Sequence, residues 1–285
     1  MPVAVVVLTF NEERRLRPCL ESVRWADEIV VVDGFSTDKT VEIAREFTDL
    51  VFQSDLLGPK NPGGYAGQRN FGLSKVSAPW VFFIDADERC SPELAASIQK
   101  ATAAAGDGAV AYEVRRSEFF FGIHSPFTHG AGWLVRLMRK DRARWNEKLV
   151  HEGVEAEGTI ERLDGDLLHF SKDTIADYLA TQNRYTSLEA EELERRGDRL
   201  PAHPLFECFR TFCNIYIYKG AYREGAFGLI MSGFFASYSF QIWAKHWERE
   251  LRAGRLDSSH PRFPLLEATA TFLRAIWIRI RPPRE

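Results

Sequence analysis

The sequence contains little cysteine, and its four cysteines are scattered as Cys19, Cys90, Cys208 and Cys213. None of them forms a CxxC pair or a paired Cys/His pattern, so neither a zinc site nor a disulfide framework is indicated. Low-complexity tracts are also lacking, while 45% of the 285 residues are hydrophobic and 27% are charged. This composition excludes a disordered, collagenous or coiled-coil protein and predicts a folded one, by default in a reducing, cytoplasmic setting.

A strong charge of one sign is absent as well. The formal net charge is -3, which gives no support to nucleic-acid binding. The first ten residues, MPVAVVVLTF, lack a basic segment and a small-residue cleavage site, so we expect a first strand rather than a signal peptide. No GxGxxG follows a strand and no GxxxxGK(S/T) occurs, which argues against a dinucleotide-binding fold and a P-loop.

The first hundred residues alternate between strand and helix patterns. Apolar, β-branched runs predict strands at 3–10, 27–32, 50–53 and 80–84. Helical spacing and capping residues predict helices at 14–23, 41–47, 65–76 and from Pro92 onward. This order is typical of a parallel, doubly wound α/β sheet, which binds its ligands at the carboxyl ends of the strands.

Acidic residues follow three of these predicted strands. Glu12 comes after the first strand, Asp33 ends the second, and Asp85 and Asp87 follow the fourth. Because parallel strands end at one edge, we expect these carboxylates to converge. Carboxylates in a cleft repel each other unless a cation lies between them, and hard oxygen ligands suit Mg²⁺ or Mn²⁺. Such a metal usually completes its shell with phosphate oxygens, which favours a nucleoside diphosphate as ligand.

Four motifs occur in order along this half of the chain, namely VVVLTFNEE, VVVDGFSTDKT, GQRN and FFIDADE. Together they resemble the family-2 glycosyltransferases, most strongly over residues 1–100. The resemblance implies the GT-A fold, in which a Rossmann-like nucleotide-binding sheet is joined to an acceptor subdomain. Farther along, RWNEKLVHEGV and LLHFSKDTIADYLATQNRYTSLEAEE are similar to a narrower group, the bacterial lipopolysaccharide inner-core β-1,4-glucosyltransferases that act on heptose.

The resemblance implies a pocket for the base and ribose of a UDP-sugar. Leu8, Phe10 and Glu12 would line it, and Asp33 would accept a hydrogen bond from the uracil ring. The chain departs from the family in having Gly-Phe after Asp33 where many members have Asp-Gly, so Asp33 is the single acid there. From the residues alone, Asp33 and Asp38 are also candidates for capping the next helix, which is our interpretation of Asp38.

The resemblance also implies the diphosphate and metal contacts. Arg69 would help to stabilise the diphosphate, and Asp85 would touch ribose or metal. Asp87, the second acid of the DxD motif, would hold the metal that bridges the phosphates, and His151 is a further candidate for the metal shell or the donor phosphate. Arg69 on the first turn of a helix and a single histidine are both common as merely structural groups.

Inverting transfer needs a general base to take the proton of the acceptor hydroxyl. The candidates lie beyond the DxD motif, in residues 145–154, where Glu152 is our choice and Glu147 is second. Either glutamate has an alternative role as a salt-bridged loop acid.

Three segments are expected along the chain. Residues 1–108 would bind the nucleotide-sugar, 109–200 would bind the acceptor and supply the base, and 201–285 would form a helical tail. In the middle segment we expect strands at 112–116 and 133–140, an aromatic loop at 119–128 and a helix at 173–194. Four arginines there are candidates for meeting phosphate groups of a lipid-linked acceptor, with a solvated basic face as the alternative: Arg115, Arg116, Arg136 and Arg139.

The tail is rich in aromatic residues, with 13 among the 42 residues from Phe206 to Trp247, and residues 225–244 carry no charge. Its serines and glycines argue against a true transmembrane span, so we expect an in-plane or re-entrant segment flanked by cations that hold anionic lipid heads. Residues 263–281 repeat this composition. The alternative is a helical dimer interface, which would make the protein a homo-oligomer.

These observations and the resemblance together predict a cytoplasmic enzyme, peripheral or monotopic at the inner membrane. It would move a hexose from a UDP-sugar to a saccharide acceptor with inversion, with glucose to lipopolysaccharide-core heptose as the specific prediction. Transfer to a polyprenyl phosphate or another surface glycan is the alternative within this class. A sugar-nucleotide pyrophosphorylase and a non-catalytic membrane- or glycan-binding module are the alternatives outside it.

Overall fold

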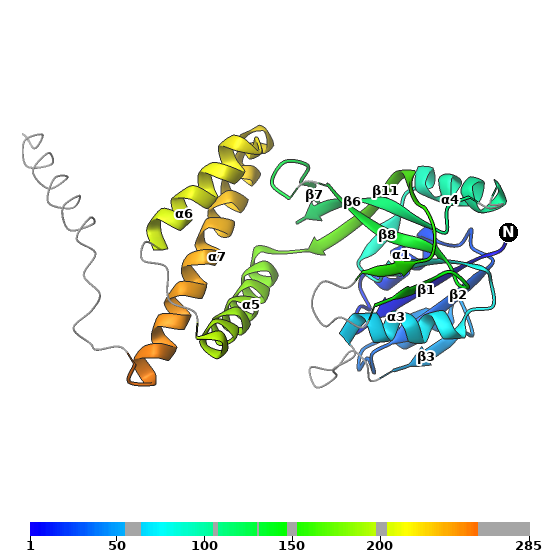
Figure 1. Ribbon diagram of the computed structural model, residues 1–285, viewed down its shortest axis with the longest axis horizontal. Helices are drawn as coiled ribbons and strands as arrows, with labels where there is room; N and C mark the ends of the chain where they lie inside the picture. The colour runs from blue at the N-terminus through cyan, green and yellow to red at the C-terminus, as the bar shows by residue number, and fades with distance from the viewer. Residues whose placement is uncertain (55–63, 105–107, 130, 147–152, 198–203, 256–285) are drawn as a thin grey trace, which may run out of the picture. The chain divides into compact units, whose positions relative to one another are not determined.

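The structure, a computed structural model, describes residues 1–54, 64–104, 108–129, 131–146, 153–197 and 204–255. The chain divides into two compact units, Met1–Thr174 and Ile175–Glu285. The first unit is built on a mixed α/β sheet, and the described part of the second unit is helical (Figure 1). The assignment of donor, acceptor and tail functions to 1–108, 109–200 and 201–285 stays a prediction.

The first half of the α/β unit has the predicted parallel arrangement. Its four strands pair in the order β3-β2-β1-β4, and all three pairings are parallel. The strands are β1 (Val3–Thr9), β2 (Glu28–Asp33), β3 (Val51–Gln53) and β4 (Trp80–Asp85). The helices between and after them are α1 (Leu16–Ser22), α2 (Thr40–Arg45), α3 (Gly64–Lys75) and α4 (Pro92–Ala104). All of these elements were predicted from hydrophobic pattern and turn chemistry.

The sheet then continues as a mixed one. The strands β8 (Ala131–Arg139), β6 (Ala111–Phe120), β11 (Ile160–Lys172) and β5 (Glu88–Cys90) follow β4 in that order. The strand β8 is antiparallel to both β4 and β6, while β11 is parallel to β6 and antiparallel to β5. The strands β5 and β11 were not predicted, because β5 is only three residues long and β11 is interrupted by charged residues and Gly165.

The expected aromatic loop at 119–128 is wrong in its first half. Phe119 and Phe120 are the last residues of β6, and β7 (Ile123–His124) folds back to pair with them. The ring of Phe119 stacks on those of His124 and Phe170, each with centroids 4.9 Å apart. A separate two-stranded sheet joins β9 (Ala143–Trp145) to β10 (Val154–Ala156).

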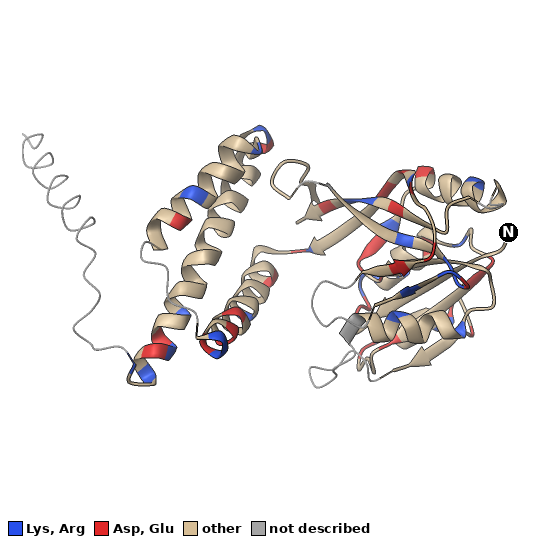
Figure 2. Cartoon of the chain, viewed as in Figure 1, with Lys and Arg blue, Asp and Glu red and all other residues tan. Residues whose placement is uncertain are grey.

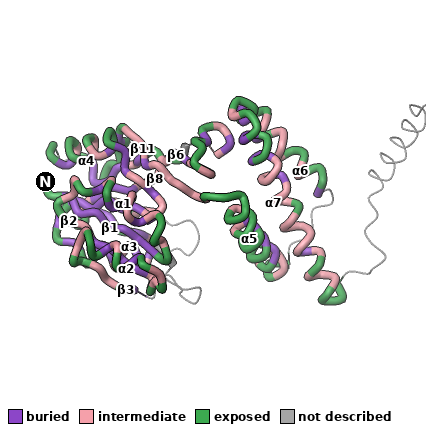
Figure 3. Tube along the Cα trace, turned by 180° about the vertical axis from the view of Figure 1, so that it is seen from behind, coloured by how far each residue is buried: buried purple, intermediate pink, exposed green. Residues whose placement is uncertain are grey.

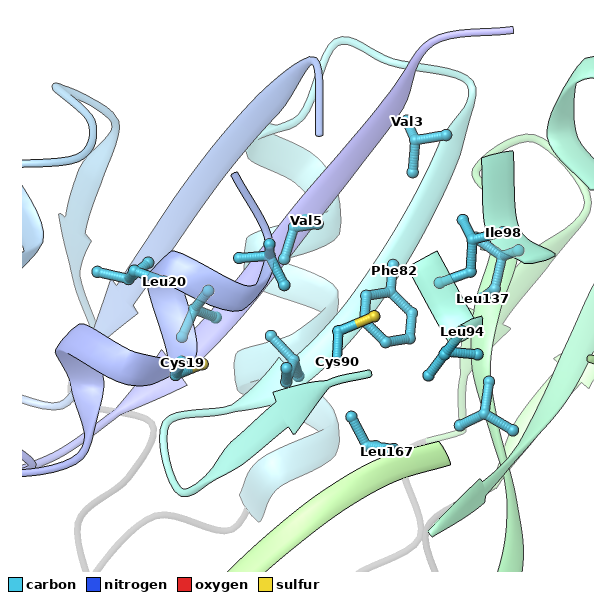
Figure 4. Close-up of a cluster of buried hydrophobic side chains, with 14 of the residues drawn as sticks. Val3, Val5, Cys19, Leu20, Phe82, Cys90, Leu94, Ile98, Leu137 and Leu167 are labelled. Carbon is cyan, nitrogen blue, oxygen red and sulfur yellow. The ribbon is translucent and has the colours of Figure 1, made fainter. Parts of the chain in front are cut away.

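The parallel strands are buried on both faces, and each face carries its own core. All seven residues of β1 are buried. Val3, Val5 and Val7 pack on one side with residues of α1, α2 and α4, while Ala4 and Val6 pack on the other with residues of α3. Figure 4 shows part of the first core, and Figure 3 shows the buried trace running through β1 and its neighbours. Both cores therefore fix the strand ends on which the site is built.

The second unit contains the predicted helix α5 (Ile175–Arg196), followed by α6 (Pro204–Cys213), a π-helix η2 (Asn214–Tyr218), a 3₁₀ turn η3 (Ala221–Glu224) and α7 (Gly225–Arg252). Residues 225–244 thus belong to one continuous α-helix. The helix α7 packs against α5 and α6. Within the described residues, no helix combines the length and hydropathy of a membrane span.

A glycine in β11 makes a close contact that tests this packing. Gly165 has φ +91°, and a Cβ there would lie 2.3 Å from the backbone nitrogen of Leu94 in α4. We expect Gly165→Ala to lower the free energy of unfolding by about 3 kcal/mol, through both strain and overlap. Gly122→Ala is the matched control, because Gly122 has φ +76° and open space around it. Urea unfolding followed by tryptophan fluorescence measures both, and equal losses would contradict the close α4–β11 contact.

Candidate active site

The carboxyl ends of β1, β2 and β4 lie side by side at one edge of the sheet. Thr9 of β1 is in register with Asp33 of β2, and Leu8 is in register with Asp85 of β4. The backbone N–H of Ala86 also donates to the carbonyl of Leu8 at 3.0 Å, which carries the DxD segment along the end of β1. The predicted convergence of the acidic strand ends is confirmed.

Asp33 is fully buried and organises the turn that follows β2. Its carboxylate accepts hydrogen bonds from the backbone N–H and the hydroxyl of Ser36, and from the side-chain amide of Gln53 at 3.2 Å. Asp38 accepts the backbone N–H groups of Thr40, the first residue of α2, and of Glu13, while the N-cap position itself is Lys39. The loops after β1 and β2 are therefore tied to each other.

Two phenylalanines are exposed on these tied loops. Phe10 follows β1 and Phe35 follows β2, and about half of each side chain is accessible to solvent. Asn11 and Phe35 both have left-handed backbones, with φ 54° and 63°, a conformation that is uncommon outside glycine and marks functional turns. The side-chain oxygen of Asn11 accepts the backbone N–H of Thr37 at 2.8 Å, which holds this geometry.

Asp85 is held by two arginines. Its Oδ1 lies 3.1 Å from Nη2 of Arg69 on α3, and its Oδ2 lies 3.0 Å from Nη2 of Arg136 on β8. The same Nη2 of Arg136 donates to Oε1 of Glu88 at 2.8 Å, and the other oxygen of Glu88 accepts the Asp85 backbone N–H at 2.9 Å. The guanidinium of Arg69 also packs over the ring of Trp145. Arg136 and Glu88 are buried, so their charges are compensated by each other rather than by water.

Asp87 is held through the neighbouring strands β6 and β11. Nε2 of His169 lies 3.2 Å from Oδ2 of Asp87, and Nδ1 of His169 lies 2.6 Å from Oε2 of Glu118. Nε of Arg116 lies 2.8 Å from Oε1 of Glu118, and its Nη1 lies 3.9 Å from Oε1 of Glu88. Glu88 also contacts Arg136 and the backbone of Asp85, so the residues around Asp85 and those around Asp87 form a single network.

We call this network the charged ring; its contacts form an open path that begins at Arg69, passes through Asp85 and ends at Asp87. Its members alternate in charge around the path and come from α3, β4, β5, β6, β8 and β11, together with the turn between β4 and β5. In order they are Arg69, Asp85, Arg136, Glu88, Arg116, Glu118, His169 and Asp87. Figure 2 shows acidic and basic residues together on the strands β6, β8 and β11 that supply half of it.

The ring shifts the pKa values of Asp85 and Glu88 in opposite directions. Burial alone would raise the pKa of Asp85, but Arg136 and Arg69 outweigh it and hold that pKa well below its usual range. Burial raises the pKa of Glu88 to about 7, against the opposing effect of Arg136. Asp85 is therefore the permanent anion that the two arginines neutralise.

His169 is a cation in this arrangement. Burial would lower its pKa, but its hydrogen bonds to Asp87 and Glu118 raise that pKa to about 10. A protonated imidazole donates from both nitrogens, which matches its position between two carboxylates. With His169 charged, the four acids of the ring face four cations.

Glu12 lies at the same edge, in the loop after β1. Burial and the negative charge of Asp87 raise the pKa of its carboxyl to about 7. Its backbone N–H donates to the hydroxyl of Thr40 at 2.8 Å, which fixes the loop against α2. Of the other predicted donor contacts, Leu8, Asp33 and Arg69 are buried, whereas Phe10 is exposed and Asp85 is partly exposed like Glu12.

A divalent cation has a limited set of protein ligands at this edge. Among the described residues, no three or more His, Cys, Asp or Glu side chains are grouped to hold a metal. Both oxygens of Asp85 accept from arginines, whereas Asp87 has His169 as its ion-pair partner. One carboxylate fits a metal that takes few protein ligands and completes its shell with phosphate oxygens, and the protonated His169 could become a ligand only after losing a proton. The predicted Glu147, His151 and Glu152 lie outside the described residues.

Sequence analysis did not single out Glu88 or Glu118, and it did not predict how the members of the ring pair. We had considered Arg116 and Arg136 as phosphate contacts, but they pair with the acids of the ring. Likewise Arg115 pairs with Asp166 and Arg139 with Asp141. The sequence signal that was available is the closeness of arginines and acids in RRSE and IDADER, which becomes informative only when β6 and β5 are known to flank β11.

The match to a family model defines the class of protein. The model "Glycosyl transferase family 2" matches residues 4–156, more than half of the chain. The chain belongs to this family and is a glycosyltransferase. The resemblance inferred from the four motifs is thereby confirmed, and the mixed α/β sheet agrees with the GT-A fold that it implies.

Individual relatives are similar over nearly the whole length. The lipopolysaccharide core biosynthesis glycosyltransferase LpsC of Rhizobium meliloti (strain 1021) is 32% identical over 260 residues, which cover 90% of this chain and 95% of LpsC. The uncharacterized glycosyltransferase RP128 of Rickettsia prowazekii is 28% identical, with 90% of each chain covered. A solved structure of Mycobacterium tuberculosis glucosyl-3-phosphoglycerate synthase with Mn²⁺, UDP and phosphoglyceric acid matches at TM-score 0.41 and 19% identity, covering 70% of this chain and 79% of that one.

Removal of one ring cation tests the electrostatic account. We expect Arg136→Met to lower the free energy of unfolding by about 3–5 kcal/mol, because Asp85 and Glu88 lose their shared buried partner. Arg115→Met is the control, since Arg115 is half-exposed in its pair with Asp166 and should cost at most about 1 kcal/mol. Urea unfolding of both variants gives the comparison, and a small, equal loss would refute a structural role for Arg136.

Proposed function

We propose that the protein is an inverting, metal-dependent glycosyltransferase that moves a hexose from a UDP-sugar to a saccharide of the lipopolysaccharide core. The observation that carries this proposal is the placement of Asp87, which the charged ring holds at the strand edge beside the tied loops of Phe10 and Phe35. Family membership supplies the reaction class, and the similarity to LpsC supports the acceptor class. Glucose and heptose are the specific donor sugar and acceptor that we propose.

The donor base would bind at the loops after β1 and β2. The exposed rings of Phe10 and Phe35 offer apolar faces for a flat base, and Leu8 and Glu12 complete this side of the pocket. An ionised carboxylate has about four acceptor positions, and Asp33 uses three of them for Ser36 and Gln53. We infer that the uracil N–H takes the remaining position, which lies on Oδ1, because Oδ2 already accepts from the Ser36 backbone and the Gln53 amide.

The diphosphate would lie at the DxD motif. Asp87 and His169 would hold Mg²⁺ or Mn²⁺, with His151 as a further candidate ligand, and the metal when bound would stabilise the charge of the leaving UDP. Binding through His169 would require the imidazole to give up its proton. Arg69 and Arg136 keep Asp85 anionic and fixed, which supports our proposal that Asp85 would lie near the ribose and Asp87 toward the phosphates.

The acceptor would meet the donor on the side built by residues 109–200. Glu152 would take the proton from the attacking hydroxyl as the new bond forms on the face opposite the leaving UDP, which inverts the anomeric centre. The acceptor would be lipid-linked and presented at the cytoplasmic surface of the inner membrane.

Loss of the Asp87 carboxylate gives the test of the donor site. We expect Asp87→Asn to weaken UDP binding at least about tenfold with Mn²⁺ present, and to change it little without metal. Isothermal titration calorimetry measures both conditions. Asp49→Asn, an exposed acid beyond the opposite end of the sheet, is the control. Unchanged UDP affinity of Asp87→Asn with Mn²⁺ would sink the metal assignment.

The base is tested separately from the donor site. We expect Glu152→Gln to lower kcat for hexose transfer by about 10²–10⁴-fold, because a general base contributes on that scale, while UDP affinity stays unchanged. Glu147→Gln serves as the comparison variant and should retain activity. If the two variants exchange behaviour, Glu147 is the base instead.

A further inference from the structure

The motif GQRN on α3 contains an asparagine, Asn70, that the proposed function leaves unused. The helix α3 packs on the sheet beside β1 and β2 (Figure 1) and also contacts β9. Nδ2 of Asn70 donates to the carbonyl oxygen of Trp145 at 2.9 Å, and the backbone N–H of Trp145 donates to Oδ1 of Asn70 at 3.1 Å. One side-chain amide therefore pairs with both backbone groups of the last residue of β9, as a neighbouring strand would.

The ring of Trp145 is fixed as well as its backbone. The residue is only 6% exposed. The guanidinium carbon of Arg69 lies 4.6 Å from the centroid of the ring, and the ring of Phe83 meets it edge-on with centroids 5.4 Å apart. Phe83 stands two residues before Asp85 in β4, and Arg69 binds Asp85. The end of β9 is thus fixed against the strand that leads into the DxD motif.

The structure describes the residues on either side of 147–152, and these two residues bind each other. The backbone N–H of Asn146 donates to the carbonyl oxygen of Gly153 at 2.9 Å, and the backbone N–H of Gly153 donates to Oδ1 of Asn146 at 3.2 Å. The nitrogen of Gly153 is also the atom that forms the peptide bond with Glu152. Because Asn146 directly follows the residue that Asn70 holds, a continuous path leads from α3 to the main chain that adjoins Glu152.

We propose that Asn70 is a positioning residue for the transfer step. It fixes the end of β9 relative to Asp85 and, through Asn146 and Gly153, it fixes the main chain that adjoins Glu152. This inference rests on the proposed function, in which Glu152 is the general base. A base must lie within hydrogen-bond reach of the hydroxyl that it deprotonates, and a displacement of about 1 Å lowers the rate by up to about 100-fold. Loss of Asn70 therefore reduces kcat while UDP affinity is retained.

Kinetics with UDP-glucose and a heptose-containing lipopolysaccharide core oligosaccharide test this role. We expect Asn70→Ala to lower kcat by about 10–100-fold and to change UDP affinity with Mn²⁺ less than about twofold, because Asp87 and its partners are untouched. Asn146→Ala breaks the next contact along the path, at a partly exposed position, and should lower kcat in the same range. Ser77→Ala is the control, since it removes a hydrogen bond of 2.8 Å to Glu28 near the other end of α3 and should change neither value.

A double-mutant cycle separates positioning of the base from a general loss of stability. In a Glu152→Gln background, Asn70→Ala should lower kcat by less than about threefold further, whereas in a Glu147→Gln background it should keep its full effect. An equal loss in both backgrounds would overturn the proposal. A loss that vanishes only in the Glu147→Gln background would contradict the choice of Glu152 in the proposed function. It would leave the positioning role of Asn70 standing, since Glu147 directly follows Asn146.

Hydrogen–deuterium exchange of the segment 143–156 gives a readout that needs no acceptor. We expect faster exchange in Asn70→Ala than in the wild type or in Ser77→Ala, because the backbone N–H of Trp145 loses its acceptor. Unchanged exchange would overturn the proposal whatever the kinetics. Wild-type protein that transfers no glucose to the oligosaccharide, together with faster exchange in Asn70→Ala, would contradict the proposed function and leave the hold of Asn70 on β9 standing.

Discussion

The candidate site depends on the compensation of buried charge between the two aspartates of the DxD motif. Arg136 and Glu88 are both removed from water, and neither charge would be tolerated there alone. Each has its partner because β4, β8, β6, β11 and β5 are successive strands of one sheet, and β5 follows β4 in the chain after a single turn. The mixed extension of the sheet therefore does more than enlarge the core, because it supplies the charges that fix the end of β4.

This arrangement gives different partners to Asp85 and Asp87, although only one residue lies between them in the sequence. Asp85 has both oxygens bound by arginines, which fixes the end of β4. Within the described residues, the ion-pair partner of Asp87 is His169. The proposed division, with Asp85 near ribose and Asp87 toward metal and phosphate, follows from this difference in partners.

The parallel half of the fold was predictable because its information is local. Continuous apolar strands, capping residues and helical spacing marked every element from β1 to α4 except β5, and the acids at the strand ends marked the site. The rest depends on contacts distant in sequence: Glu88 and Glu118 became site residues only through strand pairings of β11. The residues predicted to bind the donor lie at or beside the carboxyl ends of β1, β2 and β4, but their roles in donor binding stay predictions. They are Leu8, Phe10, Glu12, Asp33, Arg69, Asp85 and Asp87.

A crystal structure of the protein with UDP and Mn²⁺, with the metal located by anomalous scattering, tests the central claim most directly. The account predicts the manganese on Asp87, phosphate oxygens in its remaining positions, and Asp85 still bound by Arg69 and Arg136. A manganese ion on Asp85, with its arginines released, would contradict the view that the charged ring reserves Asp87 for the metal. UDP bound away from the ends of β1, β2 and β4 would contradict the site itself.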